Sequence, residues 1–300
     1  MRMRVRRIGG NRPTLVLRAA ASLSALALAG CAPGPPPAAA MPATLTDTLG
    51  ALSAETPARS DATPILRVVA YNIKHGRGMD DVVDLVRIAD VLRGLNADVI
   101  ALQEVDDRTE RTGGVDQAGV LAELLGYRGV HGPHRPYQGG HYGNAVLTRL
   151  PIRSTTTHPI PPASGSALAV LEVEVATEAG PVSVVSVHLA GSLDERMAQA
   201  RLLDELFTDG DHPVVLAGDF NGRPDDAVVQ ALGRRWSILP KSGARFTYPA
   251  DEPDREIDFV MIPPDGQLRP VRHVVTHEPL ASDHRPLVAD LLFHPPPSTP

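Results

Sequence analysis

The chain has 300 residues, of which 43% are hydrophobic, so it can form one large domain or two small ones with ample apolar material for a core. Aromatic residues make up only 4%, which leaves the filling of that core to Val, Leu and Ala. The formal net charge is −6, and without residues 1–30, which hold six arginines and no acid, it is −12 (23 basic against 35 acidic side chains). Such an acidic surface argues against general coating of nucleic acids, which proteins bind through Lys and Arg.

The N-terminus predicts an exported protein. Arginine-rich residues 1–18 precede an apolar run at 19–29 that is too short to span a membrane, as is typical of a signal peptide. The segment Leu28-Ala29-Gly30-Cys31 resembles a bacterial lipobox, which implies cleavage before Cys31 and attachment of lipid to its sulfur. The alternative is an ordinary secretory signal followed by an incidental cysteine. Cys31 is the single cysteine, so no disulfide can form within the chain.

Composition then divides the rest of the chain. Residues 31–63 are rich in Pro and Ala without periodicity, so we expect a tether. Residues 64–295 alternate strand and helix patterns and predict one α/β domain, followed by a tail at 296–300.

Apolar runs and helical spacing predict the elements of this domain. We expect helices at 82–92, with Asp80 or Asp81 as N-cap and Asn96 beyond its end, and at 120–125, ended by Gly126. A third apolar stripe runs from Leu193 to Phe207, and a short helix is expected after Pro224. The predicted strands lie at 66–70, 98–102, 144–148, 167–175, 182–187, 214–217, 257–262 and 287–293.

The segment Val214-Val215-Leu216-Ala217-Gly218-Asp219-Phe220-Asn221 carries the sharpest polar signal. Four apolar residues predict a buried strand, and Gly218 is expected to end it with a tight turn. If the chain stays extended, Asp219 and Asn221 point to one side at the carboxyl end of the strand, where ligands bind in open α/β sheets. The alternative is a strand followed by an Asx-type turn without a functional role.

Three further polar positions stand beside apolar runs. Glu104 follows the buried run at 99–102, so its carboxylate needs a partner, either a metal ion or a cation such as Lys74. Asn72 follows the first strand, where its amide can also satisfy loop backbone groups. His188 ends another strand and can equally be a core histidine with its hydrogen bonds satisfied.

The dipeptide Asp283-His284 is the last candidate. Asp283 offers a hard oxygen ligand suited to Mg²⁺ or Mn²⁺, and His284 can point elsewhere, toward a phosphate. Asp258 could orient this histidine from another strand, as the carboxylate of a catalytic triad does. The alternative is a capped turn before Pro286. Motifs for zinc proteases, serine hydrolases and phosphate-binding loops are absent from the sequence, so acid, amide and histidine chemistry remains.

Seven motifs of this kind follow one another: Tyr71-Asn72-Ile73, Leu102-Gln103-Glu104-Val105, Gly143-Asn144-Ala145-Val146-Leu147, Ser186-Val187-His188-Leu189, Gly218-Asp219-Phe220-Asn221, Ile257-Asp258-Phe259 and Ser282-Asp283-His284-Arg285-Pro286. In this order, over residues 65–294, they resemble the endonuclease/exonuclease/phosphatase superfamily. The resemblance implies a four-layer α/β/β/α sandwich of two packed, mixed, largely antiparallel sheets flanked by helices. The residue patterns by themselves give only the alternation of strands and helices.

The resemblance also implies a metal and an activated water. Asn72 and Glu104 would hold Mg²⁺, or Mn²⁺ in its place, with Asp283 close to the ion. Asp219 would position or deprotonate the attacking water, and Asn221 would hold a phosphate oxygen and the nucleophile. Phosphodiester hydrolysis needs both this activation and neutralisation of charge on the phosphorus oxygens.

The two histidines complete the implied site. His188 and His284, the latter oriented by Asp258, would contact the scissile phosphate. Some relatives carry an acid where this chain has Lys74, so we exclude Lys74 from the metal site. Some relatives also carry, near the strand at 144–148, an acid that orients the histidine equivalent to His188. This chain lacks that acid, and Asn144 is the candidate for the role. The expected substrate contacts are Asn144, Arg111 and Tyr248.

The expected activity is therefore hydrolysis of phosphoester bonds by an exported protein. We expect a monomer, lipid-anchored through Cys31 at the outer face of the cell membrane, that acts on a small or lipid phosphoester. The first alternative is a secreted nuclease for DNA or RNA, with a local basic rim. The second is a non-catalytic binding protein on the same fold, although Glu104, Asp219 and His284 are all retained.

Overall fold

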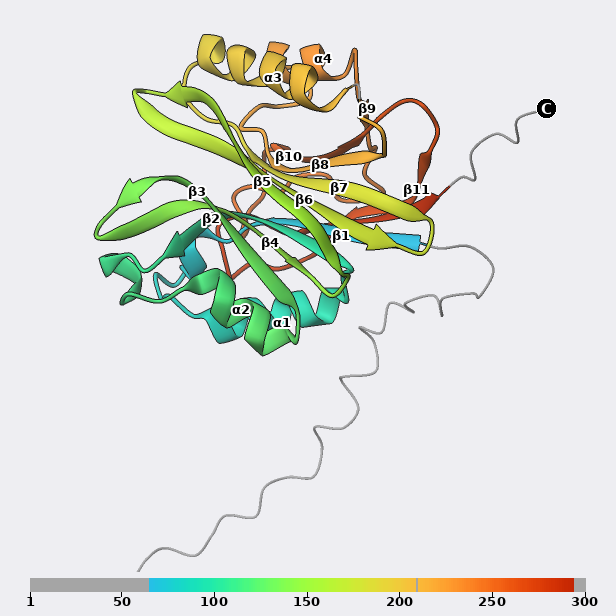
Figure 1. The fold of residues 1–300 in the computed structure, drawn as a ribbon. Helices are drawn as coiled ribbons and strands as arrows, with labels where there is room; N and C mark the ends of the chain where they lie inside the picture. The colour runs from blue at the N-terminus through green and yellow to red at the C-terminus, as the bar shows by residue number, and fades with distance from the viewer. Residues whose placement is uncertain (1–64, 209, 294–300) are drawn as a thin grey trace, which may run out of the picture. The chain divides into compact units, whose positions relative to one another are not determined.

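A computed structural model describes residues 65–208 and 210–293 (Figure 1). The predictions of a signal peptide, of lipidation at Cys31 and of a tether at 31–63 lie outside the described residues, as does the tail at 296–300. Among the described residues, the structure contains no helix with the length and apolar character that a membrane span requires.

Two six-stranded sheets form the centre of the domain. The first runs, from edge to edge, through β11 (Leu268–Val275), β12 (Leu287–Phe293), β1 (Ile65–Asn72), β2 (Val99–Asp107), β4 (Gly140–Thr148) and β3 (Arg128–Tyr137). The second runs through β5 (Ile152–Ala163), β6 (Ser166–Thr177), β7 (Gly180–His188), β8 (Val214–Asp219), β10 (Asp258–Ile262) and β9 (Ser237–Ile238). Each sheet has one parallel pair, β1 with β2 and β7 with β8, and its other neighbours are antiparallel.

The alternation of side chains along each strand creates three apolar layers. Residues such as Val68 of β1 and Val215 of β8 pack together between the sheets. The opposite face of β1, including Val69, packs on α1 (Leu85–Leu95) and α2 (Gln117–Leu125). The outer face of the second sheet packs on α3 (Leu193–Phe207) and α4 (Ala227–Leu232). Figure 1 shows these two helix pairs on opposite sides of the sheets, which confirms the four-layer sandwich.

The start of α1 differs from the prediction. The helix begins at Leu85 with Asp84 as its N-cap, and Asp84 Oδ1 accepts a hydrogen bond from the Arg87 amide at 3.0 Å. Val82 and Val86 are 52% and 58% exposed, so they do not belong to the buried stripe. The prediction of Asp80 or Asp81 as the cap is wrong because Asp84, closer to the first buried turn, supplies the capping oxygen.

Four strands were not predicted, and they are the four edge strands of the two sheets: β11, β3, β5 and β9. An edge strand is paired on one side only, so it tolerates proline and polar residues that a central strand excludes. Accordingly, β3 contains Pro133 and Pro136, and β5 contains Pro159 beside a run of threonines. These strands therefore lack the continuous apolar run on which the prediction relied.

Candidate active site

Polar side chains gather at one end of the sandwich because the inward-facing positions of several strands change from apolar to polar there. On β1, Val68 and Ala70 face the second sheet, and Asn72 continues this alternation. On β8, Ala217 faces the first sheet, and Asp219 continues it. Both polar side chains therefore enter the space between the sheets, where Asn72 Nδ2 donates to Asp219 Oδ2 at 3.2 Å.

Neighbouring strands show the same change and brace the sheets against each other. Gln103 on β2 donates from Nε2 to Ser186 Oγ on β7 at 2.9 Å. Asn144 on β4 donates from Nδ2 to the Ser186 carbonyl at 2.8 Å. All three residues are fully buried, so these bonds form a polar floor beneath the site, in which Gln103 Oε1 and Asn144 Oδ1 have no hydrogen-bond partner among the described residues.

Asp219 lies at the centre of the site. Its Oδ2 faces the Nε2 atoms of His188 and His284, each at 3.7 Å. Gly218 makes this placement possible, because a Cβ at position 218 would lie 2.0 Å from the Val187 carbonyl oxygen. The prediction that Gly218 ends the strand is wrong: β8 continues through Asp219, and the glycine permits the close approach of β7 and β8.

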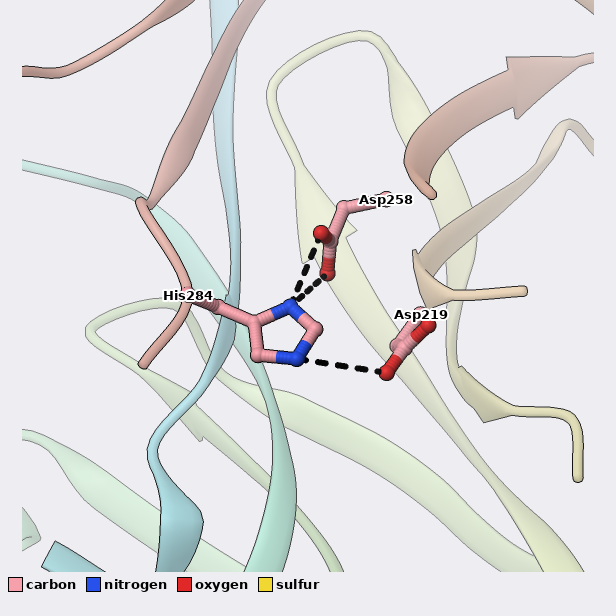
Figure 2. Close-up of side chains that lie close together, drawn as sticks. All are labelled: Asp219, Asp258 and His284. Carbon is pink, nitrogen blue, oxygen red and sulfur yellow. Dashed lines mark hydrogen bonds and ion pairs between the residues drawn. The ribbon is translucent and has the colours of Figure 1, made fainter. Parts of the chain in front are cut away.

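His284 is held between two carboxylates, as Figure 2 shows. Its Nδ1 lies 2.9 and 3.2 Å from the two carboxylate oxygens of Asp258, while its Nε2 faces Asp219. Thr247 Oγ1 donates to Asp258 Oδ2 and so fixes that carboxylate. The contact predicted between Asp258 and His284 is present, and it holds the imidazole in one orientation.

Burial and charge together set the protonation of these groups. Burial alone would lower the pKa of His284, but the carboxylates of Asp258 and Asp219 outweigh it and raise that pKa to about 10. Burial raises the pKa of Asp219 to about 6, against the opposing effect of His284 and His188. At neutral pH the site therefore holds an imidazolium beside a carboxylate, each of which stabilises the charge of the other.

Glu104 enters the site through an irregularity in β2. The register of β2 against β4 shifts between Leu102 and Val105, and Glu104 has a φ of +57°, which is uncommon for a residue with a side chain. Its carboxylate meets Asn72, whose Nδ2 donates to Glu104 Oε1 at 3.2 Å. Such strained backbone is typical of functional sites, because the surrounding structure must hold it in place.

The cation proposed as an alternative partner for Glu104 binds elsewhere. Lys74 Nζ lies 2.9 Å from Asp283 Oδ2, and within residues 65–208 and 210–293 no Lys, Arg or His forms an ion pair with Glu104. The carboxylates of Glu104 and Asp219 meet at the Asn72 side chain, whose Nδ2 donates to both while its Oδ1 accepts from the Lys74 amide at 3.1 Å. Two carboxylates beside an amide are a donor set that suits Mg²⁺ or Mn²⁺. A divalent cation therefore fits the corner, since it would give the uncompensated charge of Glu104 a partner.

A different triplet offers ligand atoms at metal-binding distances. One ligand atom each of Asp219, Asp258 and His284 lies within 4.8 Å of the others. Both ring nitrogens of His284, however, face these carboxylates, Nδ1 toward Asp258 at 2.9 Å and Nε2 toward Asp219 at 3.7 Å, and the two carboxylates raise the pKa of the histidine. This triplet is better described as a chain of ion pairs than as a metal centre.

Asn221 departs from the extended geometry expected for it. Its φ is +48°, and its amide donates to Asp219 Oδ1 at 2.8 Å, so the backbone forms an Asx-type turn directly after β8. Its Nδ2 donates to the Leu189 carbonyl at 2.8 Å. The prediction that extended backbone aligns Asp219 and Asn221 is wrong because the Asp219 side chain captures the Asn221 amide, but the turn keeps both residues together.

Of the predicted substrate contacts, the structure places Tyr248 beside the site. The Tyr248 ring packs 4.8 Å from the His284 ring, measured between centroids. Arg111 lies 5.7 Å from the centroid of the Tyr142 ring, and its guanidinium binds both carboxylate oxygens of Asp106 at 2.6 and 2.7 Å. Arg111 is therefore fixed in position, and its charge is already matched.

The role suggested for Asn144 in orienting His188 is wrong. Asn144 Nδ2 binds the Ser186 carbonyl, and His188 Nδ1 has no hydrogen-bond partner among the described residues. Asn144 is fully buried in the polar floor, and its Oδ1 has no hydrogen-bond partner among the described residues. The predicted contact of Asn144 with substrate stays a prediction.

Two residues of the site were not singled out from the sequence. Val99, Ala101 and Gln103 occupy alternate positions of β2 that face the second sheet. A polar residue at the end of this apolar series is the sequence pattern that could have indicated Gln103. Thr247 lies outside every predicted element, and only the tertiary structure brings its hydroxyl to Asp258. It therefore gave no signal in the sequence.

The sequence matches the model of the Endonuclease/Exonuclease/phosphatase family over residues 69–284. It is 27% identical over 223 residues to the uncharacterized protein YbhP of Escherichia coli (strain K12), covering 66% of this chain and 87% of that protein. The family match spans the strands that carry the site.

Solved structures give the same result for the fold. A crystal structure of an endonuclease/exonuclease/phosphatase from Beutenbergia cavernae DSM 12333 is 26% identical, with a TM-score of 0.63, and the alignment covers 78% of this chain and 73% of that one. TDP2 of D. rerio, crystallised with a single-strand DNA product, is 18% identical with a TM-score of 0.59, covering 76% and 98%. The second likeness is one of fold alone.

Proposed function

Because the chain belongs to the Endonuclease/Exonuclease/phosphatase family, we propose that it is an exported, metal-dependent hydrolase of phosphoester bonds. The observation that carries this proposal is the setting of Asp219, a buried carboxylate that faces the Nε2 atoms of two histidines and the amide of Asn72. Members of the family hydrolyse phosphoesters, and this arrangement supplies the groups that such a reaction needs.

In this proposal Asp219 accepts a proton from the attacking water. A base with a pKa of about 6 is ionised at neutral pH and still basic enough to take part in proton transfer. Asn221, held beside it by the turn, orients the water. His284, kept cationic by Asp258, donates to a phosphate oxygen where negative charge develops, and His188 does so from the other side.

We further propose that Asn72 and Glu104 hold Mg²⁺, with Mn²⁺ as a substitute, and that Asp283 lies close to the ion. The ion would act as a Lewis acid and neutralise charge on the phosphorus oxygens. Glu104 supports this assignment because it has no cationic partner in the described part of the chain, whereas Asp283 shares its charge with Lys74. Glu104 is therefore the principal carboxylate ligand in this proposal.

Replacement of the proposed base tests the function. Asp219→Asn should lower kcat for bis(p-nitrophenyl) phosphate by roughly 10²–10⁴-fold, the usual contribution of general base catalysis. Asp225→Asn is the matched control, because Asp225 is an exposed carboxylate in the loop that follows the site. Equal activity of wild type and Asp219→Asn would contradict the proposal.

A secreted nuclease is the second candidate. The Arg135 guanidinium lies over the Tyr142 ring, 4.7 Å from its centroid, and it has no ion pair within the described residues, so it offers positive charge to a nucleic-acid backbone. Nicking of a supercoiled plasmid, compared with phosphate release from phospholipid headgroup analogues, separates the two candidates. Plasmid cleavage that needs Mg²⁺ and is abolished by Asp219→Asn would favour the nuclease.

A further inference from the structure

A buried glutamine of α2 lies where the pairing of β1 with β2 ends. The last paired residues are Asn72 and Gln103, and the Ile73 amide then donates to the Gln103 carbonyl at 3.1 Å. Beyond this point the chain that leaves β1 forms a short helical turn at residues 74–76 and no longer pairs with β2. The side chain of Gln117, which is completely buried, bridges the two segments there.

The amide of Gln117 binds one backbone group of each segment. Its Oε1 accepts from the Asp106 amide at 3.0 Å, and its Nε2 donates to the His75 carbonyl at 2.7 Å. A peptide group of a neighbouring strand would likewise present an acceptor to one segment and a donor to the other. The side chain of Gln117 therefore takes the place of one rung of the ladder between the two strands.

Both segments contain strained backbone. Lys74 and His75 have φ values of +45° and +47°, and Glu104 has a φ of +57°. Residues with a side chain adopt this region rarely, and its cost in free energy must be offset by contacts with the surrounding structure. Gln117 makes such a contact with both segments at once.

The two segments also carry Asn72 and Glu104, the residues proposed to hold the metal ion. The Lys74 amide donates to Asn72 Oδ1 at 3.1 Å, so the turn after β1 orients the Asn72 side chain. On β2 the pairing with β4 is irregular at Glu104 and resumes at Val105, directly before the amide that Gln117 binds. The position of Glu104 relative to Asn72 therefore depends on how the two segments are held together.

We propose that Gln117 is a positioning residue for the metal site, which sets the position of Glu104 relative to Asn72 through the backbone of both segments. This inference rests on the proposed function and deepens it, because it assigns the affinity for the metal ion in part to a residue of α2. Side chains that hold metal ligands in place commonly contribute about 10–100-fold to metal affinity. We expect a contribution of that kind from Gln117.

The chain offers a matched control for the alternative that Gln117 only satisfies buried backbone groups. Gln199 of α3 is also completely buried, and its amide accepts from the Ala190 amide at 3.1 Å and donates to the Pro161 carbonyl at 3.1 Å. Gln199 thus bridges two backbone segments as Gln117 does, but these segments carry none of the proposed metal ligands. Gln117→Met and Gln199→Met should both destabilise the protein, because each leaves buried backbone groups unpaired.

Titration of the full chain with Mn²⁺, followed by electron paramagnetic resonance, tests the proposal without turnover. Gln117→Met keeps the length of the side chain and removes both hydrogen bonds, so it should raise the Mn²⁺ dissociation constant about tenfold. Gln199→Met should bind Mn²⁺ like the wild type. Gln117→Asn, whose amide is one methylene too short to reach both backbone groups, should also raise the constant, and it serves as the test variant if thermal unfolding shows that Gln117→Met does not fold.

A double-mutant cycle then shows whether Gln117 acts through Glu104. In the Glu104→Gln background, the Gln117 substitution should raise the Mn²⁺ dissociation constant about threefold or less, because the carboxylate that Gln117 positions is no longer present. An equal rise in both backgrounds would overturn the inference, as would an unchanged constant in the Gln117 variants, an equal rise in Gln199→Met, or a wild type that does not bind Mn²⁺. Failure of the hydrolase proposal would appear separately, as equal activity of wild type and Asp219→Asn.

Discussion

At the scale of single residues, the site is defined by how each charge is matched. Asp219 is buried and faces two histidines, Asp258 binds His284, and Lys74 binds Asp283. Each of these carboxylates has a positively charged or protonatable partner within 4 Å. Glu104 lacks one in the described residues, so it differs from the others in a way that predicts a role for a metal ion.

The protonation states predict a bell-shaped pH profile. With Asp219 required as a carboxylate and His284 as an imidazolium, kcat/KM should rise as pH increases through about 6 and fall as it increases through about 10. A bound divalent cation favours the carboxylate, so at saturating Mg²⁺ the acid limb should lie at or below pH 6. Rates for bis(p-nitrophenyl) phosphate from pH 4.5 to 11 measure both limbs.

Asp258→Asn checks the assignment of these limbs. The Asp258 carboxylate raises the pKa of both His284 and Asp219, so its removal should shift both limbs to lower pH. Glu256→Gln is the matched control, since Glu256 pairs with Lys241 and not with either group. An alkaline limb that stays in place in Asp258→Asn would contradict the role given to His284.

The uncompensated charge of Glu104 predicts weaker metal binding after its removal. Glu104→Gln keeps the shape of the side chain but removes its charge, so it should raise the Mn²⁺ dissociation constant by at least tenfold. Titration of Mn²⁺ followed by electron paramagnetic resonance measures this without turnover. Glu110→Gln, an exposed glutamate nearby, should bind Mn²⁺ like the wild type, and an unchanged constant in Glu104→Gln would exclude Glu104 as a ligand.

At the scale of the elements, the site depends on where strands carry polar residues in inward positions. The ends of β1, β7, β8 and β10 bring Asn72, His188, Asp219 and Asp258 to the same end of the sandwich. The parallel pairing of β7 and β8 places His188 opposite Asp219, and the antiparallel pairing of β8 and β10 places Asp258 opposite Asp219. Register therefore decides the constellation, and a slip of one residue would turn these side chains away.

Two glycine substitutions test this dependence on strand spacing. Gly218→Ala should destabilise the domain by roughly 2 kcal/mol or more, because the new Cβ would meet the Val187 carbonyl oxygen at 2.0 Å. Gly94→Ala, in α1, meets no atom within 4 Å and should stabilise it by about 1 kcal/mol. Urea unfolding measures both, and a Gly218→Ala protein as stable as the wild type would contradict the close approach of β7 and β8.

At the scale of the whole molecule, the first described residue and the candidate active site lie at opposite ends of β1. The chain enters β1 at Ile65, and Asn72 lies at the other end of the strand, roughly 23 Å away at about 3.3 Å per residue. We propose that residues 31–63 tether this domain to a lipid anchor at Cys31. In that case the anchor is joined at the end of β1 that is remote from the site.

The proposed anchor has a direct test. In cells expressing the full chain and fed an alkyne-tagged fatty acid, the wild type should incorporate label and fractionate with membranes. Cys31→Ala should lose both properties, because no other cysteine can take the lipid. Release of Cys31→Ala in processed form would be consistent with ordinary secretion, and labelling that persists in this variant would exclude Cys31 as the lipidated residue.

The sequence by itself determined the central strands, the order of the seven motifs and the residue types that carry the chemistry, because buried strands need continuous apolar runs and each motif follows such a run. It did not determine the four edge strands, since strands paired on one side tolerate proline and polar residues. Only the tertiary structure decided that Asp219 faces His284 opposite the predicted partner Asp258, that Lys74 binds Asp283 and that Arg135 has no ion pair within the described residues. These contacts join residues from different strands and loops, and their distances depend on register and sheet packing, which local sequence patterns do not encode.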